Sequence, residues 1–395
     1  RLIRRQRQMC IRDRSIIGEM NMQIFNSKQR EKLFPIFKKY VYLNTASTGI
    51  IPESSIQQMT NFLRRYRGEG IHHDAQSFKM MDDLREKVGN ILGTSPERIA
   101  IGFNTSFGIN ISANGLHISS GKKIVLAPDE FPANFYPWKT VAERRNNPLE
   151  IISQPDEDLF DIPDTGIIAV SWVRFFDGFR FDLNKLGKIA RKNSAFLCID
   201  GIQGAGVLSP KLDNSTVDTF SAGGQKWLLS PYGTGIFYVN ENTPLEPTFV
   251  GWLQRFALSG DYSSLRKYDL PMPKNAIKFE MGTMPYHNLW AMWNSVSLLD
   301  DIGIENIENY TTTLTEEFVL RLKDIPDVQI ISPSGKRRSS IVSIAVSPAR
   351  TVFEKLKQHR IIPAFREGKL RFSFHIYNNI EDIDRTIDIL KRVIK

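Results

Sequence analysis

One lysine of this chain stands where an amine is useful for covalent chemistry. Lys226 lies in the segment Ser221–Trp227, directly after Gly223, Gly224 and Gln225 and directly before an apolar run. Paired glycines let the backbone approach a bulky flat ligand. An apolar wall removes water from the amine, which lowers its pKa and frees it to form an imine with an aldehyde. The alternative is an ordinary turn with an exposed lysine, and the segment alone does not decide between the two.

A carboxylate earlier in the chain favours the chemical interpretation. The apolar run Ala195–Asp200 is typical of a buried strand that ends in a carboxylate, and Gln203 follows three residues later. Asp200 precedes Lys226 by 26 residues. Pyridoxal phosphate chemistry needs this pair, because the carboxylate keeps a proton on the pyridine nitrogen while the lysine holds the aldehyde carbon. Taken alone, Asp200 is equally well explained as a turn or helix-capping residue.

A third segment is suited to a phosphate group. Thr105 and Ser106 follow a predicted strand and open a helical run. Hydroxyl groups and free backbone amides at a helix N-terminus bind anions, and the helix dipole favours negative charge there. Phe131, after the next predicted strand, is positioned to stack on an aromatic cofactor. The plain alternatives are an N-cap for the hydroxyl pair and a core position for the phenylalanine.

The elements that position these residues alternate between strand and helix. Six short apolar runs predict strands, namely Arg98–Phe103, Lys122–Ala127, Ile167–Val173, Ala195–Asp200, Thr219–Ala222 and Gly235–Val239. Between them lie helical patterns such as Asp182–Asn193. This alternation predicts an α/β fold with a mostly parallel sheet flanked by helices, whose ligands gather at the carboxyl ends of the strands.

The pattern changes beyond residue 285, which predicts a smaller α+β domain. We expect helices at Asn288–Ile304, Glu305–Lys323, Ala349–His359 and Ile380–Lys395, with strands at Ser340–Ala345 and Leu370–Phe374. The resulting division has a leader at 1–19, an N-terminal segment at 20–41, a large domain at 42–285 and a small domain at 286–395.

The composition indicates a globular protein of enzyme size. The chain has 395 residues, of which 41% are hydrophobic and 24% charged, and it contains no apolar stretch long enough to span a bilayer. Two cysteines give neither a disulfide framework nor a CxxC metal site, so we expect a cytoplasmic protein with no bound metal. The net charge of +9 owes much to six arginines in residues 1–19, which we interpret as a non-native leader rather than a nucleic-acid-binding arm. We therefore expect no nucleic-acid or membrane partner.

Together these segments resemble the class V aminotransferase family, which comprises fold type I pyridoxal-phosphate enzymes and includes cysteine desulfurases and isopenicillin-epimerase-like proteins. The resemblance extends from Tyr42 to the C-terminus. It implies that Lys226 forms the Schiff base with pyridoxal 5′-phosphate and that Arg371 binds the substrate carboxylate close to Ala46. It further implies the set of cofactor-binding residues Thr105, Ser106, Phe131, Asp200, Gln203, Gln225, Lys226, Gly282 and Thr283, of which the last two belong to a segment that reaches the neighbouring subunit's phosphate in the family's dimer.

The chain also departs from the family pattern. Desulfurases carry a nucleophilic cysteine shortly before the carboxylate-binding arginine, whereas the segment Pro363–Lys369 contains none. The stacking residue is Phe131 where desulfurases have a histidine. Phe175 aligns with an asparagine that contacts the cofactor's phenolic oxygen. We therefore set cysteine desulfuration aside and keep the cofactor.

The resulting prediction is a homodimeric pyridoxal-phosphate enzyme that acts on the amino group of a small amino acid. Transamination to a 2-oxo acid is the first expectation. The alternative is a C–S or β-elimination lyase, or an epimerase-like enzyme, that uses the same lysine. A weakly catalytic homologue that only binds the cofactor is the alternative of another class.

Overall fold

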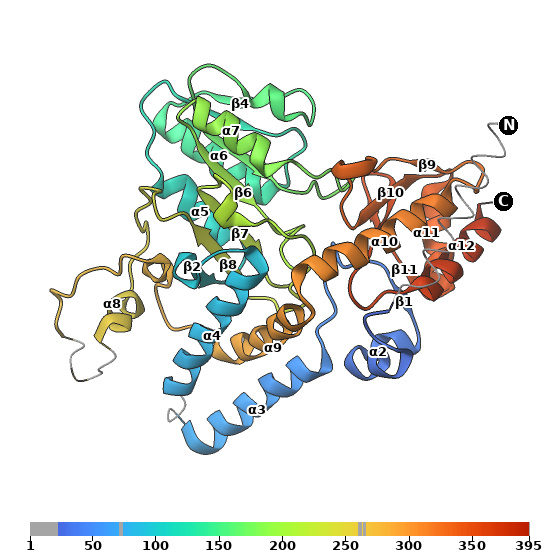
Figure 1. Ribbon diagram of the computed structural model, residues 1–395, viewed down its shortest axis with the longest axis horizontal. Coiled ribbons are helices and arrows are strands. Elements are labelled where there is room, and N and C mark those ends of the chain that lie inside the picture. Colours follow the sequence, from blue (N-terminus) through green and yellow to red (C-terminus); the bar gives the residue numbers. More distant parts are fainter. Residues whose placement is uncertain (1–22, 71–73, 260–262, 264–265, 395) are drawn as a thin grey trace.

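The computed structural model describes residues 23–70, 74–259, 263 and 266–394 of the chain. The leader predicted at 1–19 lies outside the described residues. Figure 1 shows a sheet-containing unit flanked by helices, and beside it a second unit formed by the C-terminal part of the chain.

The centre of the first unit is a seven-stranded sheet with the order β2-β8-β7-β6-β5-β3-β4. Its strands are β2 (Ile99–Gly102), β3 (Lys123–Leu126), β4 (Leu149–Ile151), β5 (Thr165–Ser171), β6 (Phe196–Asp200), β7 (Thr219–Gly223) and β8 (Gly235–Val239). All neighbouring pairs are parallel except those that involve β8, which runs antiparallel to both β2 and β7. The predicted α/β fold with a mostly parallel sheet is therefore confirmed.

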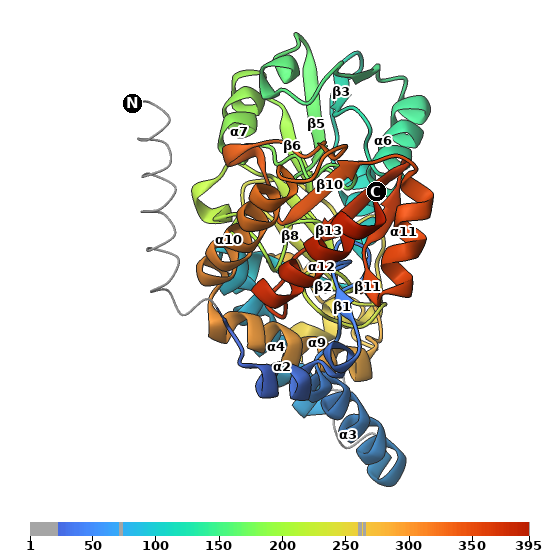
Figure 2. The ribbon, with the colours of Figure 1, turned by 90° about the vertical axis from the view of Figure 1, so that its right-hand side faces the viewer.

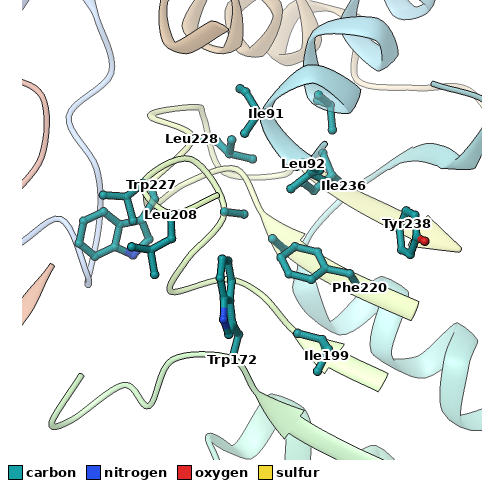
Figure 3. Packing of buried hydrophobic residues seen from close by; sticks show 14 of the residues in the cluster. Ile91, Leu92, Trp172, Ile199, Leu208, Phe220, Trp227, Leu228, Ile236 and Tyr238 are labelled. Atoms are coloured by element: carbon teal, nitrogen blue, oxygen red, sulfur yellow. The ribbon is translucent and has the colours of Figure 1, made fainter. Parts of the chain in front are cut away.

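Helices cover this sheet on both faces, because most of its strands are apolar on both sides. The helices that precede and follow these strands are α3 (Glu53–Glu69), α4 (Asp74–Leu92), α5 (Thr105–Gly115), α6 (Pro132–Arg145), α7 (Leu183–Lys192), α8 (Trp252–Ser259) and α9 (Tyr286–Ile302). On one face, α5 and α6 pack on the sheet through a cluster that contains Trp138 and Phe237. On the other, α4, α7 and α9 join a larger cluster around Trp172 and Phe220, part of which is shown in Figure 3.

The second unit has its own sheet and its own core. Its strands are β9 (Gln329–Ile330), β10 (Ile341–Ala345), β12 (Ala364–Arg366) and β13 (Lys369–Ser373), which form an antiparallel sheet with the order β12-β13-β10-β9. The helices α10 (Ile304–Leu322), α11 (Ala349–Gln358) and α12 (Ile380–Val393) lie beside this sheet (Figure 2). A buried cluster that includes Phe318, Phe372 and Leu390 holds them together.

The N-terminal segment connects the two units. The helix α2 (Ser27–Leu33) is followed by β1 (Val41–Tyr42), which pairs in parallel with β11 (Ile361–Ile362) of the second unit. Helix α9 packs on α3 and α4, and its apolar side chains belong to the large cluster of the first unit. The division of the chain at residue 286, just before α9, stays a prediction.

No helix within the described residues has both the length and the apolar character needed to cross a membrane. The carboxyl ends of β6 and β7 lie next to each other, because Asp200 and Ser221 are register partners. Asp200 is the last residue of β6, and the chain reaches Lys226 three residues after β7 ends. The topology therefore brings the predicted carboxylate and amine to one edge of the sheet.

Candidate active site

Lys226 lies in the connection between β7 and β8, which turns back on itself because these strands are antiparallel. The backbone amide of Gly224 donates to the carbonyl oxygen of Thr234 at 2.8 Å, which closes the loop at its base. Gly49 approaches the same loop from the N-terminal segment, and its amide donates to the carbonyl oxygen of Gln225 at 2.9 Å. A Cβ atom on Gly49 would lie 1.9 Å from the carbonyl oxygen of Lys226. Only glycine permits this contact.

The surroundings of Lys226 weaken its hold on a proton. Trp227, Leu228 and Leu229, which follow Lys226 directly, are fully buried; Figure 3 shows the first two in the same cluster as Trp172 and Phe220. The pKa of the Lys226 amine is lowered to about 8, mainly by burial; the charge of Asp200 opposes this change and the charge of Arg371 adds to it. A substantial share of the amine is therefore neutral, and reactive towards an aldehyde, at mildly alkaline pH.

Asp200 is a buried carboxylate with one satisfied and one unsatisfied oxygen. Its Oδ1 atom accepts a hydrogen bond from the amide of Ile202 at 3.0 Å. Its Oδ2 atom is buried and forms no hydrogen bond with any described residue. Burial raises the pKa of Asp200 to about 6, and the charge of Lys226 acts in the opposite direction. An unsatisfied buried oxygen of this kind suits a cationic N–H donor such as a protonated pyridine nitrogen.

The predicted phosphate seat lies at the start of α5. Asn104 caps this helix, because its side chain accepts from the amide of Phe107 at 3.0 Å, so Thr105 and Ser106 are the first two helical residues. The Thr105 hydroxyl accepts from the amide of Gly223 at 2.9 Å, which ties the helix start to the end of β7. The first-turn amides of a helix have no intrahelical partner. The seat thus adjoins the lysine loop and is suited to an anion, while its occupation by a phosphate stays a prediction.

Phe131 faces the lysine. Its side chain is 41% exposed, which excludes the alternative of a core residue. The Lys226 Nζ atom lies 5.6 Å from the centre of the Phe131 ring. Phe175 packs edge-to-face on this ring, with 5.4 Å between the ring centres. The two rings form an aromatic wall on which a flat cofactor can stack.

Arg371 projects from β13 and is only 2% exposed. Its Nη2 atom donates to the Ser47 hydroxyl at 2.8 Å, and its Nη1 atom donates to the carbonyl oxygen of Phe175. Its Nε atom is buried without a partner, and no carboxylate among the described residues pairs with this guanidinium. Burial and the charge of Arg366 lower the pKa of Arg371 to about 9. A buried cation without a counter-ion is costly, so the arrangement suits an anionic ligand such as a substrate carboxylate.

Gln203, predicted to contact the cofactor, and Ala46, predicted to lie near the substrate, both form hydrogen bonds within the protein. Gln203 donates from Nε2 to the carbonyl oxygen of Ala46 at 3.1 Å and accepts at Oε1 from the indole of Trp227 at 2.9 Å. It therefore bridges the N-terminal segment to the lysine loop, and its predicted contact with the cofactor stays a prediction. Ala46 is buried next to this bridge, and its amide donates to the Ser373 hydroxyl.

The other predicted residues lie on either side of this group. Gln225, which is partly buried, turns its side-chain amide back towards Gly223. Gly282 and Thr283 lie between Phe279 and α9, where Thr283 is exposed. Their role across a dimer interface stays a prediction.

Comparison with known proteins shows which family the chain belongs to. The family model described as aminotransferase class-V matches residues 41–386. The chain belongs to this family. Among curated relatives, a probable cysteine desulfurase of Pyrococcus abyssi is 24% identical over 92% of this chain and 96% of its own length. The uncharacterized aminotransferase YcbU of Bacillus subtilis is 23% identical over 91% and 96%, respectively.

Solved structures have the same fold as this class V aminotransferase family member. A complex between the cystine C–S lyase C-DES and its reaction product cysteine persulfide superposes with a TM-score of 0.82 at 22% identity, covering 91% of this chain and 99% of that one. As a member of the class V family, the chain uses pyridoxal 5′-phosphate, as the sequence predicted. The free Oδ2 atom of Asp200, the amine of Lys226 and the aromatic wall fit that cofactor.

Sequence reasoning missed three polar residues around the site. The Ser47 hydroxyl accepts hydrogen bonds from both Arg371 and Arg366. The segment that contains Arg366 was considered in the sequence only because desulfurases carry their cysteine there. Glu130 accepts hydrogen bonds from the amide and the hydroxyl of Ser171, and burial raises its pKa to about 7. Its position next to Phe131 was the available signal. The described residues contain no cluster of three or more side chains suited to hold a metal ion.

Proposed function

We propose that this class V family member is a pyridoxal-phosphate-dependent C–S lyase that acts by β-elimination on a sulfur-containing amino acid. One observation carries the proposal: the amine of Lys226, whose pKa is lowered, is under the influence of both the buried carboxylate of Asp200, which has an unsatisfied oxygen, and the guanidinium of Arg371, which has no carboxylate partner among the described residues. Lys226 suits the aldehyde of the cofactor, Asp200 suits its pyridine nitrogen, and Arg371 suits the carboxylate of an amino-acid substrate. The names of the curated relatives, mostly cysteine desulfurases, favour C–S cleavage over amino transfer.

Asp200, Arg371 and Lys226 each have a separate role in this reaction. Pyridoxal phosphate, when bound, supplies a conjugated ring that withdraws electrons from the carbon atoms of the substrate. Asp200 holds the proton on the pyridine nitrogen that makes this withdrawal strong. Arg371 orients the substrate through its α-carboxylate. The Lys226 amine removes the α-proton, which allows the bond between Cβ and sulfur to break.

The sulfur has no protein acceptor within the described part of the chain. Cys198 is the free cysteine there, and it is buried in β6, where burial raises the pKa of its thiol. A thiol of this kind is a poor nucleophile. The sulfur therefore leaves as a free thiol, and the remaining carbon skeleton is released, after reaction with water, as pyruvate and ammonia.

The proposal includes a homodimer in the cytoplasm. Phe249, Val250 and Trp252 form a run of exposed apolar side chains, and Gly251 within it packs against the backbone of Met281. Thr283 follows two residues later, in the segment predicted to reach the neighbouring subunit. An exposed apolar patch of this kind is typical of an interface. Sedimentation of the purified protein should show a dimer.

The reaction is tested by product analysis of the cofactor-loaded protein. It is incubated with S-substituted L-cysteines, and free thiol, pyruvate and ammonia are measured. A parallel reaction contains 2-oxoglutarate or pyruvate and is analysed for the amino acid that amino transfer would form. Equal amounts of thiol, pyruvate and ammonia support the lyase. New amino acid without thiol would identify an aminotransferase instead, and a cofactor spectrum that no amino acid changes would identify a homologue with little catalysis.

A further inference from the structure

A second arginine stands next to Arg371 on the same hairpin. Strands β12 and β13 are antiparallel, with Ala364 opposite Arg371 and Arg366 opposite Lys369. Opposed residues in a sheet point to the same face, and so do residues two apart along a strand. Arg366 and Arg371 therefore project from the same face of the hairpin, towards the N-terminal segment that contains Ser47.

The contacts confirm this arrangement. Arg366 donates from Nη2 to the Ser47 hydroxyl at 3.1 Å, and Arg371 donates from its own Nη2 to the same oxygen at 2.8 Å. The hydroxyl oxygen has two lone pairs, and both are occupied by cations. Arg366 also donates a hydrogen bond from Nη1 to the carbonyl oxygen of its neighbour Phe365 at 2.9 Å. Neither guanidinium has a carboxylate partner among the described residues.

Three cationic side chains thus converge on one place. Arg366 and Arg371 share the Ser47 hydroxyl, and the charges of both lower the pKa of the Lys226 amine. Like charges repel, so an anion that enters between these side chains stabilises them. The α-carboxylate of an amino acid satisfies Arg371 and leaves the charge of Arg366 without a counterpart.

We propose that the substrate of this site carries a second acidic group on its side chain and that Arg366 binds it. The inference rests on the proposed amino-acid chemistry at Lys226 and adds the class of substrate. That class consists of α-amino acids whose side chain ends in a carboxylate or an equivalent oxyanion. Arg366 is exposed, so it is positioned to meet the distal end of a substrate while buried Arg371 holds the near end.

Binding of simple acids tests the second anion site without any turnover. The titrations compare succinate with butyrate, which has the same carbon chain and one carboxylate, by calorimetry on the cofactor-loaded protein. We expect succinate to bind about ten- to one-hundredfold more tightly. Arg366→Gln should remove this preference and leave butyrate binding within about twofold, whereas Arg366→Lys should retain part of it. Arg392→Gln, which removes an exposed charge from the last turn of α12, is the matched control and should change neither affinity.

Turnover then links the site to the substrate. S-carboxymethyl-L-cysteine is compared with S-isobutyl-L-cysteine, which has an uncharged branched group in place of the second carboxylate. A higher kcat/KM for the acidic compound, lost in Arg366→Gln, supports the inference. Equal weakening of both compounds by Arg366→Gln would overturn it, because Arg366 would then serve the α-carboxylate. Cleavage of both compounds at equal rates would overturn the inference and leave the proposed lyase standing. A retained preference for succinate without any C–S cleavage would overturn the lyase alone.

Discussion

Replacement of Asp200 by asparagine should stabilise the apoprotein in a pH-dependent manner. The carboxylate has a pKa of about 6 in the folded chain, raised by burial from 3.8. A raised pKa means that folding favours the protonated form of Asp200. The stability of the wild-type protein therefore falls as the pH rises from the pKa of Asp200 in the unfolded chain to its pKa in the folded chain. The shift of about two units corresponds to roughly 3 kcal/mol once the pH is well above 6. About half of that should develop between pH 5 and pH 8.

Urea unfolding of the apoprotein at several pH values measures this effect. The difference in unfolding free energy between Asp200→Asn and the wild type should grow by roughly 1–1.5 kcal/mol from pH 5 to pH 8 in favour of the variant. The amide that replaces the Oδ2 atom adds a constant cost, so the slope and not the absolute value carries the argument. Asp301→Asn removes an exposed carboxylate from α9 and is the control. A flat difference, or one that shrinks with pH, would refute the claim that Asp200 is an uncompensated buried acid.

The same substitution, which should stabilise the apoprotein, should weaken its binding of the cofactor. The protonated pyridine nitrogen supplies the partner that the Oδ2 atom of Asp200 lacks. Asp200→Asn should therefore weaken pyridoxal phosphate binding about ten- to one-hundredfold, as measured by dialysis equilibrium. Unchanged affinity would place the pyridine nitrogen elsewhere.

Further variants test the lysine loop and its neighbours. Lys226→Ala should abolish the visible absorption of the bound cofactor and lower kcat by about 10³-fold or more with an unchanged circular dichroism spectrum; a retained band would assign another amine. In the wild type, the rate of cofactor uptake by the apoprotein should rise with pH and level off above about 8, because the Lys226 amine must lose its proton to react; a rate that is flat from pH 6 to 9 contradicts the lowered pKa. Arg371→Gln should raise KM for α-amino acids about ten- to one-hundredfold and leave the binding of simple amines unchanged; equal losses would give the carboxylate to another cation. Gly49→Ala should destabilise the fold by about 2–3 kcal/mol, since the added Cβ meets the Lys226 carbonyl oxygen at 1.9 Å, whereas Gly335→Ala, at an open position, should cost only the strain of its backbone conformation; equal costs would show that the close approach is unimportant.

The central fold follows from short-range patterns in the sequence. Strands such as β5 and β6 are almost wholly apolar because both faces of the sheet are covered, and such runs are readable without a structure. The edge strand β4 was missed, because it has only three residues, none of which is fully buried, and Ile151 is exposed. The short strands β9 and β11 were missed for the same reason, since two residues carry no periodic signal.

The site was predictable where one residue type is chemically required and unpredictable where packing decides. Lys226 and Asp200 follow strands and have few chemical substitutes, so their positions emerge from the sequence. The duty of Gln203 depends on the approach of Ala46, which lies more than 150 residues away in the chain. Arg366 meets Ser47 only because the β12–β13 hairpin folds back over the N-terminal segment, and no local pattern indicates this contact.

The stretch from Tyr42 to Gly49 has a consequence for the order of assembly during synthesis. It contacts the lysine loop through Gly49, β11 through Tyr42 and β13 through Ser47, so the ribosome must finish nearly the whole polypeptide before the pocket closes. Arg371, which donates to Ser47, is available only after β13 has been synthesised, so the part of the pocket proposed to bind the substrate carboxylate is the last to form. We expect nascent chains that end before β13 to lack this part of the pocket.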